Sequence, residues 1–257
     1  MNQLKRANVL GVGVSPINIQ MALETVDEWI KTDSHQYVCV TGVHGVMESQ
    51  RDDKLRRIHN TAGLVTPDGM PLVWLGHMQG CKLIQRVYGP DLMVALCEHS
   101  IARGYRHFLY GSSPDVLERL AENLKTRFPG LQIVGMFSPP FRALMQEEDS
   151  QIISEINSVQ PHIIWVGLST PKQEYWMSEH MGKVNAQVMV GVGAAFDFLS
   201  GFKKQAPLWM QKLGLEWFFR LLNEPRRLWE RYLRNIPTFL ILETGQLLHL
   251  KHYNINR

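Results

Sequence analysis

The sequence predicts an α/β protein: a Rossmann-like parallel sheet flanked by helices, followed by a helical C-terminal appendage. Strand-like apolar runs alternate with helix-like runs, as in sheets whose strands are joined by crossover helices. Residues 163–166 and 188–192 are almost wholly apolar, which is typical of strands covered on both faces. This alternation stops after Gly201. We therefore expect an α/β core over residues 1–201 and an appendage over residues 202–257.

In the first half of the chain, strand-like and helix-like runs alternate less regularly than in the second half. Residues 7–14 are short and apolar, and they are expected to form a first strand. A helix is predicted over residues 18–31, where apolar residues recur at helical spacing: Ile19, Leu23, Val26 and Ile30. The remaining expectations are a strand over 37–42, a helix over 45–60, a strand over 63–69, and helices over 70–78 and 91–104.

The second half begins with the clearest strand–helix unit. A strand over 107–113 ends in glycine and serine, Ser113 can cap the following helix, and Pro114 suits the first helical position. Within residues 114–128, one apolar face is formed by Val116, Leu117, Leu120 and Leu124. The expectations that follow are a strand over 131–140, a helix over 149–159, a strand over 162–169, a helix from Pro171, and a strand that starts the 187–201 segment.

Composition narrows the class of protein. The 257 residues are 45% hydrophobic and 20% charged, as in soluble globular proteins, and the net charge of +3 is too small to indicate nucleic-acid binding. The N-terminal apolar run is too short for a signal peptide, and no run of ~18 apolar residues predicts a membrane-spanning helix. A disulfide framework or zinc site is not expected, and a reducing cytosol fits, because the cysteines are odd in number and form no C-x-x-C pair: Cys39, Cys81 and Cys97.

Glycine-containing turns follow several predicted strands and are candidates for ligand binding. The turn Gly111-Ser112-Ser113 precedes a helix and would present N–H groups to a phosphate, although a well-capped helix start explains it equally. Lys172 and Gln173 could reach a ligand from the next such turn, or be solvated surface. Because carboxyl ends of parallel strands share one edge of a sheet, these turns are expected to converge. The other candidates in them are Gly167, Gly191, Gly193, Phe196 and Asp197.

Common cofactor motifs are missing from the sequence. Gly11-x-Gly13 lacks the third glycine and the acidic partner of a dinucleotide site. There is no D-x-D, H-E-x-x-H, Walker A or G-x-S-x-G motif. The histidines His44, His59 and His77 lack metal-ligand spacing, so no metal is expected.

Asp68 lies in the segment Thr66-Pro67-Asp68-Gly69, between a predicted strand and a predicted helix. Proline, aspartate and glycine are good turn residues, so a turn alone explains the pattern. A carboxylate at the carboxyl end of a strand can instead face a ligand crevice. Both interpretations remain open from these residues.

The appendage interleaves arginines with large apolar and aromatic side chains between Trp217 and Arg234. This pattern suits a membrane–water interface with anionic head groups. The alternative is a helical pair whose aromatic residues pack on the core while its arginines stay in water.

Six ordered motifs resemble one family. They are TPDGMPLVW, QRVYGPDL, YGSSPDVLERLAENL, VGLSTPKQE, GVGAAFDFLSG and APLWMQKLGLEWFFRLLNEPRRLWERY. Over about residues 8–235 the chain resembles the bacterial WecG/TagA/CpsF glycosyltransferases (glycosyltransferase family 26). The resemblance implies a catalytic core and an appendage that associates with an anionic membrane surface, on the cytoplasmic face of the plasma membrane.

The activity that the resemblance implies is an inverting, metal-independent transfer without a cofactor. The donor would be a UDP-sugar, often of N-acetylmannosamine or its uronic acid, and the acceptor a polyprenyl-diphosphate-linked sugar of cell-surface polysaccharide or teichoic acid synthesis. The family's base falls on Asp68 and its other active-site positions on Thr41, Arg86 and Gln173. Its tail arginines fall on Arg220, Arg227 and Arg231. Family members often carry an asparagine two residues after the threonine, whereas this chain has Val43 there, followed by His44.

An inverting transfer needs a base that takes the acceptor proton, which is the role implied for Asp68. An apolar surrounding raises the pKa of a carboxyl, and Met70, Leu72, Val73 and Trp74 are expected to supply one. Two other classes remain as alternatives: a nucleotide-dependent oxidoreductase, and a non-catalytic subunit that binds a sugar nucleotide. A homo-oligomer is compatible with the sequence.

Overall fold

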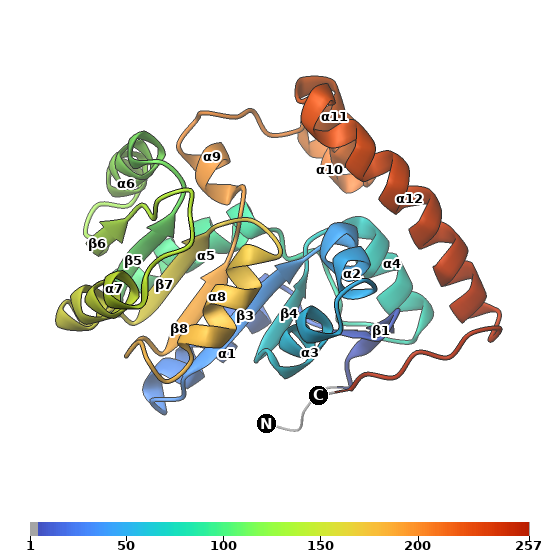
Figure 1. The fold of residues 1–257 in the computed structure, drawn as a ribbon, viewed down its shortest axis with the longest axis horizontal. Coiled ribbons are helices and arrows are strands. Elements are labelled where there is room, and N and C mark those ends of the chain that lie inside the picture. Colours follow the sequence, from blue (N-terminus) through green and yellow to red (C-terminus); the bar gives the residue numbers. More distant parts are fainter. Residues whose placement is uncertain (1–4, 257) are drawn as a thin grey trace. The chain divides into compact units, whose positions relative to one another are not determined.

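The computed structural model describes residues 5–256 and confirms the predicted fold class (Figure 1). Its parallel sheet has the strand order β4-β3-β8-β7-β5-β6, and β1 and β2 form a separate antiparallel pair. The strands are β1 (Ala7–Val9), β2 (Val12–Val14), β3 (Gln36–Thr41), β4 (Leu64–Pro67), β5 (Arg106–Gly111), β6 (Gln132–Phe137), β7 (Ile163–Gly167) and β8 (Val188–Gly191). The helices are α1 (Ile19–Lys31), α2 (Val43–Ser49), α3 (Asp53–Thr61), α4 (Met70–Met78), α5 (Gly89–Ile101), α6 (Pro114–Arg127), α7 (Gln146–Ser158), α8 (Lys172–His180), α9 (Ala195–Leu199), α10 (Leu208–Lys212), α11 (Glu216–Asn223) and α12 (Pro225–Leu247).

The chain divides into two compact units. Unit 1 comprises the residues up to Asn18, Thr41–Tyr88 and the chain from Gln205 onward. Unit 2 comprises Ile19–Val40 and Gly89–Lys204. The C-terminal helices therefore share a unit with β4 and with the loop that carries Asp68.

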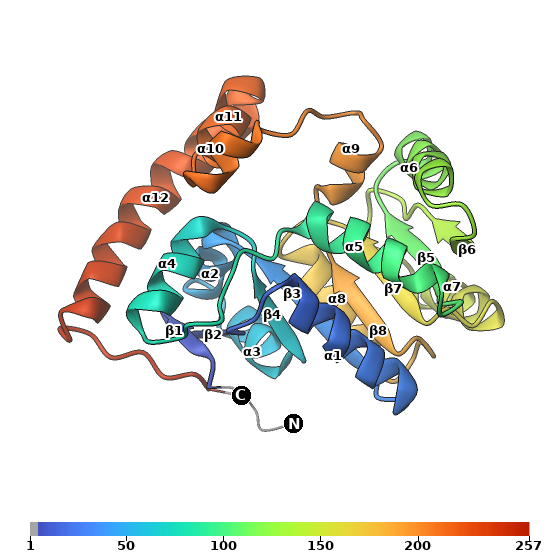
Figure 2. The same cartoon turned by 180° about the vertical axis from the view of Figure 1, so that it is seen from behind.

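Unit 2 is built on buried central strands. Every residue from Ile163 to Val166 in β7 is fully buried, and in β8 Val188, Met189 and Val190 are at most 1% exposed. Helix α8 lies on one face of these strands, and α1 and α5 lie on the opposite face, which is in front in Figure 2. Cover on both faces explains why these strands are almost wholly apolar in sequence.

The N-terminal apolar run in unit 1 differs from its prediction. Residues 7–14 form a hairpin of β1 and β2, because Leu10 and Gly11 both adopt positive φ, at 50° and 82°. Two consecutive residues in this conformation make the tight turn that two antiparallel strands require. The Asn8 Oδ1 accepts a hydrogen bond from the Gly11 N–H at 2.8 Å and closes the turn.

The single helix predicted over 45–60 is also wrong, since α2 ends at Ser49 and α3 begins at Asp53. The Asp52 side chain accepts hydrogen bonds from the N–H groups of Lys54 and Leu55, at 3.0 and 3.1 Å. An N-cap of this kind starts a new helix and explains the break.

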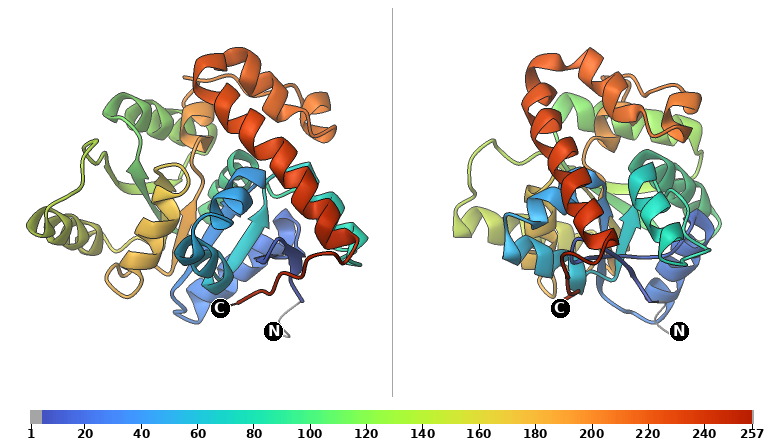
Figure 3. Two further views of the ribbon diagram at one scale, coloured as in Figure 1. Left: turned by 45° about the vertical axis from the view of Figure 1, so that its right-hand side comes forward. Right: turned by 90° about the vertical axis from the view of Figure 1, so that its right-hand side faces the viewer.

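Helix α12 is held to unit 1 near its middle and at its C-terminal end (Figure 3). Arg51 donates to the Asn235 Oδ1 at 2.8 Å, and the Leu10 N–H donates to the Gln246 Oε1 at 2.9 Å. The segment after α12 returns to the hairpin, where Asn8 donates to the Tyr253 carbonyl at 2.6 Å. These bonds fix the helix on its own unit.

Candidate functional site

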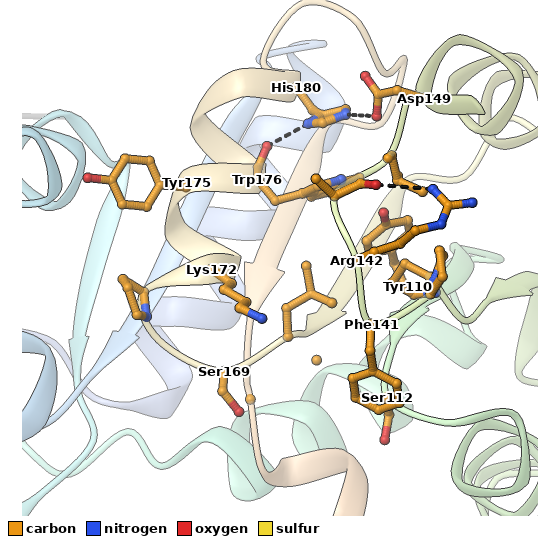
Figure 4. A pocket seen from close by; sticks show the side chains of 18 of the residues that line it. Tyr110, Ser112, Phe141, Arg142, Asp149, Ser169, Lys172, Tyr175, Trp176 and His180 are labelled. Carbon is orange, nitrogen blue, oxygen red and sulfur yellow. Dashed lines mark hydrogen bonds and ion pairs between the residues drawn. The ribbon is translucent and has the colours of Figure 1, made fainter. Parts of the chain in front are cut away.

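Unit 2 contains a cavity of about 1070 Å³ beside the first turns of α6 and α8, named here the α6–α8 pocket (Figure 4). Of the predicted candidates, its lining includes Ser112, Ser113, Gly167, Lys172, Gly193 and Asp197. In register, Gly111 of β5 is paired with Gly167 of β7, and Val166 is paired with Gly191 of β8. The expected convergence of these turns at one sheet edge is therefore present in the structure.

Two residues other than glycine with left-handed φ lie at this pocket. Ser112 and Ser169, which follow β5 and β7, both adopt left-handed φ, at 61° and 64°. For residues other than glycine this conformation costs about 1–2 kcal/mol, and such strain gathers at functional sites. The Ser138 Oγ donates to the Ser112 carbonyl at 2.6 Å and supports one of these turns.

The polar groups of the α6–α8 pocket suit an anion. Ser113 is the N-cap residue of α6, as predicted, but its hydroxyl makes no capping bond and lines the pocket. Lys172, at the first position of α8, points into the pocket in Figure 4. Asp197 is paired with Lys203 at 2.8 Å. A helix N-terminus with nearby lysine is a favourable place for phosphate.

One wall of the pocket is aromatic. The Trp176 ring is stacked between Tyr110 and His180, with both centroid distances 4.2 Å. His180 is held in turn by Asp149, at 3.0 Å from its Nε2 (Figure 4). Phe141 is fully exposed on the loop that borders the same pocket.

Packing within unit 2 accounts for several predicted candidates, of which Gly167 also lines the pocket. A Cβ on Gly167 would lie 2.6 Å from the ring of Phe196, which is 1% exposed. A Cβ on Gly111 would lie 2.7 Å from the Gly167 backbone, and one on Gly191 would lie 2.7 Å from Met177. Contacts within the chain thus exclude a side chain at Gly111 and Gly167, whereas the flexible end of Met177 can move away from one at Gly191.

Gln173 is 2% exposed and lies beneath the glycine turn after β8. Its Nε2 donates to the Glu174 carboxyl at 3.1 Å, and Thr170 donates to the same oxygen at 2.9 Å. Burial raises the pKa of Glu174. The Gln173 Oε1 has no hydrogen-bond partner within residues 5–256, and it lies 3.4 Å from the Cβ position of Gly193. A buried acceptor without a partner in this part of the chain therefore lies beside this turn.

Unit 1 contains a second cavity of about 590 Å³, named here the α4–α12 groove. At one end it is lined by polar residues that include Asp68, Arg86, Glu216, Arg220 and Arg231. Most of its apolar lining lies on α4 and α12: Met70, Pro71, Trp74, Leu75, Met78, Ile236, Phe239, Leu240 and Leu247. Of the residues expected around Asp68, Met70 and Trp74 line the groove, whereas Leu72 and Val73 are buried and do not.

Asp68 follows β4 directly and precedes α4, so both interpretations of the segment apply. Its N–H donates to the Thr41 carbonyl at 3.0 Å, and its carbonyl accepts from the Arg86 Nε at 2.9 Å. A Cβ on Gly42 would lie 3.6 Å from the Asp68 Oδ2, an ordinary contact distance, so the carboxylate lies beside the residue that precedes α2. The turn fixes the backbone and aims the carboxylate into the groove.

Arg86 makes three of its hydrogen bonds within unit 1. Besides Asp68, it donates to the Gln211 Oε1 at 2.8 Å and to Glu216 at 2.6 Å. Its guanidinium lies 4.0 Å from the Tyr88 ring centroid. Burial and the Asp68 charge raise the pKa of Glu216, and burial with the charges of Glu216 and Asp68 raises the pKa of Tyr88. Arg86 therefore connects the Asp68 turn to α10 and α11.

The predicted tail arginines have different surroundings. Arg220 and Arg231 line the groove, whereas Arg227 does not and pairs with Glu224 at 2.6 Å. His44 also lines the groove, where burial and the charges of Arg231, Arg51 and Arg220 lower its pKa to about 4. The groove end near Asp68 thus combines a carboxylate with cationic groups and a neutral histidine.

The C-terminal helices leave large apolar side chains in solvent. The large apolar residues of α10 to α12 exposed by at least 37% are Leu208, Trp209, Leu213, Trp217, Phe218, Leu222, Trp229, Leu233, Leu240, Ile241 and Leu247. Exposed apolar surface of this extent marks an interaction site. Across residues 5–256, no helix is both long and apolar enough to cross a bilayer. The same residues include no cluster of three or more histidine, cysteine or acidic side chains suited to a metal ion.

In enzymes built on a parallel α/β sheet, ligands bind beside the carboxyl ends of the strands, which is where the α6–α8 pocket lies. The chain belongs to the glycosyl transferase WecG/TagA/CpsF family, whose sequence model matches residues 7–253. It is therefore a glycosyltransferase, and the oxidoreductase and non-catalytic alternatives are set aside. The Gly11-x-Gly13 pair lies in the β1–β2 hairpin, outside any strand-to-helix turn.

Similar proteins include three enzymes named N-acetylglucosaminyldiphosphoundecaprenol N-acetyl-beta-D-mannosaminyltransferase. That of Bacillus spizizenii is 30% identical over 193 residues, covering 75% of this chain and 72% of the relative. That of Bacillus subtilis (strain 168) is 29% identical over 182 residues, covering 71% and 68%. That of Staphylococcus aureus (strain MW2) is 25% identical over 237 residues, covering 91% of each chain.

Sequence reasoning missed several residues that shape the two sites. Glu216 and Tyr88 surround Arg86, and Trp176 forms the aromatic wall. Glu243 of α12 is 4% exposed and lines the groove. A signal existed for Glu216, which lies four residues before Arg220 in the family motif, but nothing in the sequence marked Glu243 as buried.

Proposed function

We propose that the protein transfers an N-acetylmannosamine-type sugar from a UDP-sugar to a polyprenyl-diphosphate-linked N-acetylglucosamine, with inversion and without a metal. The observation that carries this proposal is the α4–α12 groove, where Asp68 shares one cavity with Arg220 and Arg231. The names of the relatives supply the sugar and the acceptor class.

The α6–α8 pocket is proposed to hold the UDP part of the donor. Its volume of about 1070 Å³ is sufficient for a sugar nucleotide, and Lys172 with the first turn of α6 provides positive potential for the diphosphate. The aromatic wall at Trp176 and the exposed Phe141 offer faces for a uracil ring. Gln173, whose buried Oε1 has no hydrogen-bond partner within residues 5–256 and lies beside the Gly193 turn, is proposed to accept a hydrogen bond from a sugar hydroxyl.

Asp68 is proposed as the base. The acceptor hydroxyl gives its proton to the carboxylate while its oxygen attacks the anomeric carbon, and the bond to UDP breaks on the opposite face. Thr41 and Arg86 hold the Asp68 backbone by one hydrogen bond each, and they act as positioning residues. Arg220 and Arg231 are proposed to bind a substrate diphosphate, for which the planar guanidinium is well shaped.

The exposed apolar residues of α10–α12, with arginines among them, are proposed to lie on the cytoplasmic face of an anionic membrane. This orientation gives the groove access to an acceptor that resides in lipid.

Mass spectrometry of products formed from a UDP-sugar panel and polyprenyl-diphosphate-GlcNAc analogues tests the proposal. We expect one sugar to be added, with Asp68→Asn slowing turnover by ~10²-fold or more while UDP binding is kept. Asp53→Asn, which removes an exposed carboxylate from the same unit, is the matched control. Absence of transfer from every donor, or equal turnover of the two variants, would contradict the proposed function.

A further inference from the structure

The α4–α12 groove extends well beyond the groups that chemistry at Asp68 needs. Helix α4 begins beside Asp68 and ends at Met78, and its nine residues span about 13 Å. The groove follows it over this distance, because Met70, Trp74 and Met78 all belong to its lining.

The two helices that form the groove meet again at its far end. The side-chain amide of Gln79, just after α4, donates to the Asn8 carbonyl at 2.8 Å. The Gln246 amide of α12 donates to the same carbonyl at 2.7 Å. At the near end, the Asn235 amide of α12 contacts the His44 Nδ1 at 3.3 Å, and both residues line the groove beside Asp68. The groove is therefore framed at both ends by hydrogen bonds.

Charge is distributed unevenly along the groove. Asp68, Arg86, Glu216, Arg220 and Arg231 lie at the near end, whereas the α4 residues that line it from Met70 to Met78 carry no charge. From Ile236 onward, Glu243 is the single ionisable side chain that α12 adds to this lining. A cationic end with an apolar channel leading from it complements a diphosphate joined to a hydrocarbon.

We propose that the α4–α12 groove binds the first isoprene units of the acceptor's polyprenyl chain, with the diphosphate at Arg220 and Arg231. This inference rests on the proposed function, because it places the lipid of that acceptor. The groove thus selects the acceptor by its hydrocarbon as well as by its sugar, and it draws the chain out of the membrane beside the base.

A matched pair of variants on α12 tests this placement. Leu240 lines the groove and Ile241, the next residue, does not, and both side chains are more than half exposed. Leu240→Trp is expected to obstruct the groove, whereas Ile241→Trp adds the same ring outside it. Since both side chains are exposed, neither replacement disturbs the core.

The assay compares two soluble acceptors that share a GlcNAc-diphosphate head, one carrying a farnesyl chain and the other a methyl group. Wild type and Ile241→Trp should show a KM for the farnesyl acceptor roughly tenfold or more below that for the methyl acceptor, because each buried methylene strengthens binding about fourfold. Leu240→Trp should lose most of this preference. Equal KM values for both acceptors in the wild type, or the same preference in both variants, would overturn the inference.

Binding without turnover separates this inference from the proposed function. Farnesyl diphosphate carrying a benzophenone should crosslink to peptides from 70–78 and 236–247, and unlabelled farnesyl diphosphate should compete. Labelling elsewhere, or equal competition by phosphatidylglycerol vesicles, would assign the groove to another occupant. If no sugar is transferred to either acceptor but these peptides are labelled, the proposed function fails while the groove assignment stands.

Discussion

Glu243→Gln should stabilise the protein at alkaline pH and leave it unchanged in acid. Glu243 lies on α12 with 4% of its surface exposed, and neither carboxylate oxygen has a hydrogen-bond partner within residues 5–256. Burial raises its pKa from 4.5 to about 7. The α4 residues that line the groove carry no charge. The Tyr253 phenol, after α12, interacts electrostatically with Glu243: burial and the Glu243 charge raise the pKa of Tyr253.

The direction of the stability change follows from the pH at which the unfolded and the folded chain each lose the Glu243 proton. Below about pH 4.5 the carboxyl is protonated in both the folded and unfolded chain, so it costs nothing. Between pH 4.5 and about 7 the unfolded chain ionises first, and the folded state loses stability relative to it. Above about pH 7 the penalty is complete. A difference of about 2.5 pKa units, at 1.36 kcal/mol each, gives about 3 kcal/mol.

The assay is urea unfolding followed by tryptophan fluorescence at intervals between pH 4 and pH 9. Wild type and Glu243→Gln should have similar free energies of unfolding at pH 4, and the variant should gain up to about 3 kcal/mol by pH 8. Glu230→Gln removes an exposed carboxylate from the same helix and should follow the wild type throughout. If the free energy of unfolding of Glu243→Gln equals that of the wild type at every pH, ionising Glu243 carries no burial penalty and the reasoning is refuted.

Four further outcomes are expected. Gly167→Ala should cost about 1–3 kcal/mol in urea unfolding because its Cβ would overlap a buried phenylalanine ring, whereas Gly245→Ala, where a Cβ meets nothing within 4 Å, should cost nothing. Arg86→Lys should reduce kcat about tenfold or more while leaving UDP affinity unchanged, since an ammonium cannot replace three guanidinium bonds; an unchanged kcat would deny Arg86 its positioning role. Arg231→Glu should lower transfer to a lipid acceptor more than Arg227→Glu, because Arg231 lines the groove and Arg227 pairs with Glu224; equal losses would argue against the groove as the diphosphate site. Transfer should persist in EDTA, and a complete loss that Mg²⁺ or Mn²⁺ restores would contradict metal independence.

Local patterns were sufficient for most of the secondary structure. The apolar runs of β7 and β8, the start of α6 at Pro114 and the helical appendage were all predictable, because each depends on residues near one another in sequence. The two errors had local causes that the apolar pattern did not reveal. The hairpin at Leu10 and Gly11 depends on two positive φ values, and the break before α3 depends on the Asp52 cap.

The sequence by itself determined the family, the fold class and the position of Asp68 between a strand and a helix, because motif order and hydrophobic period are properties of the chain. Only the tertiary structure decided what these residues touch. Arg86 is bonded to Gln211 and Glu216, more than 120 positions away, and Glu243 is buried in a groove whose other wall is α4. Desolvation and pairing depend on neighbours from distant segments, so no local pattern encodes them.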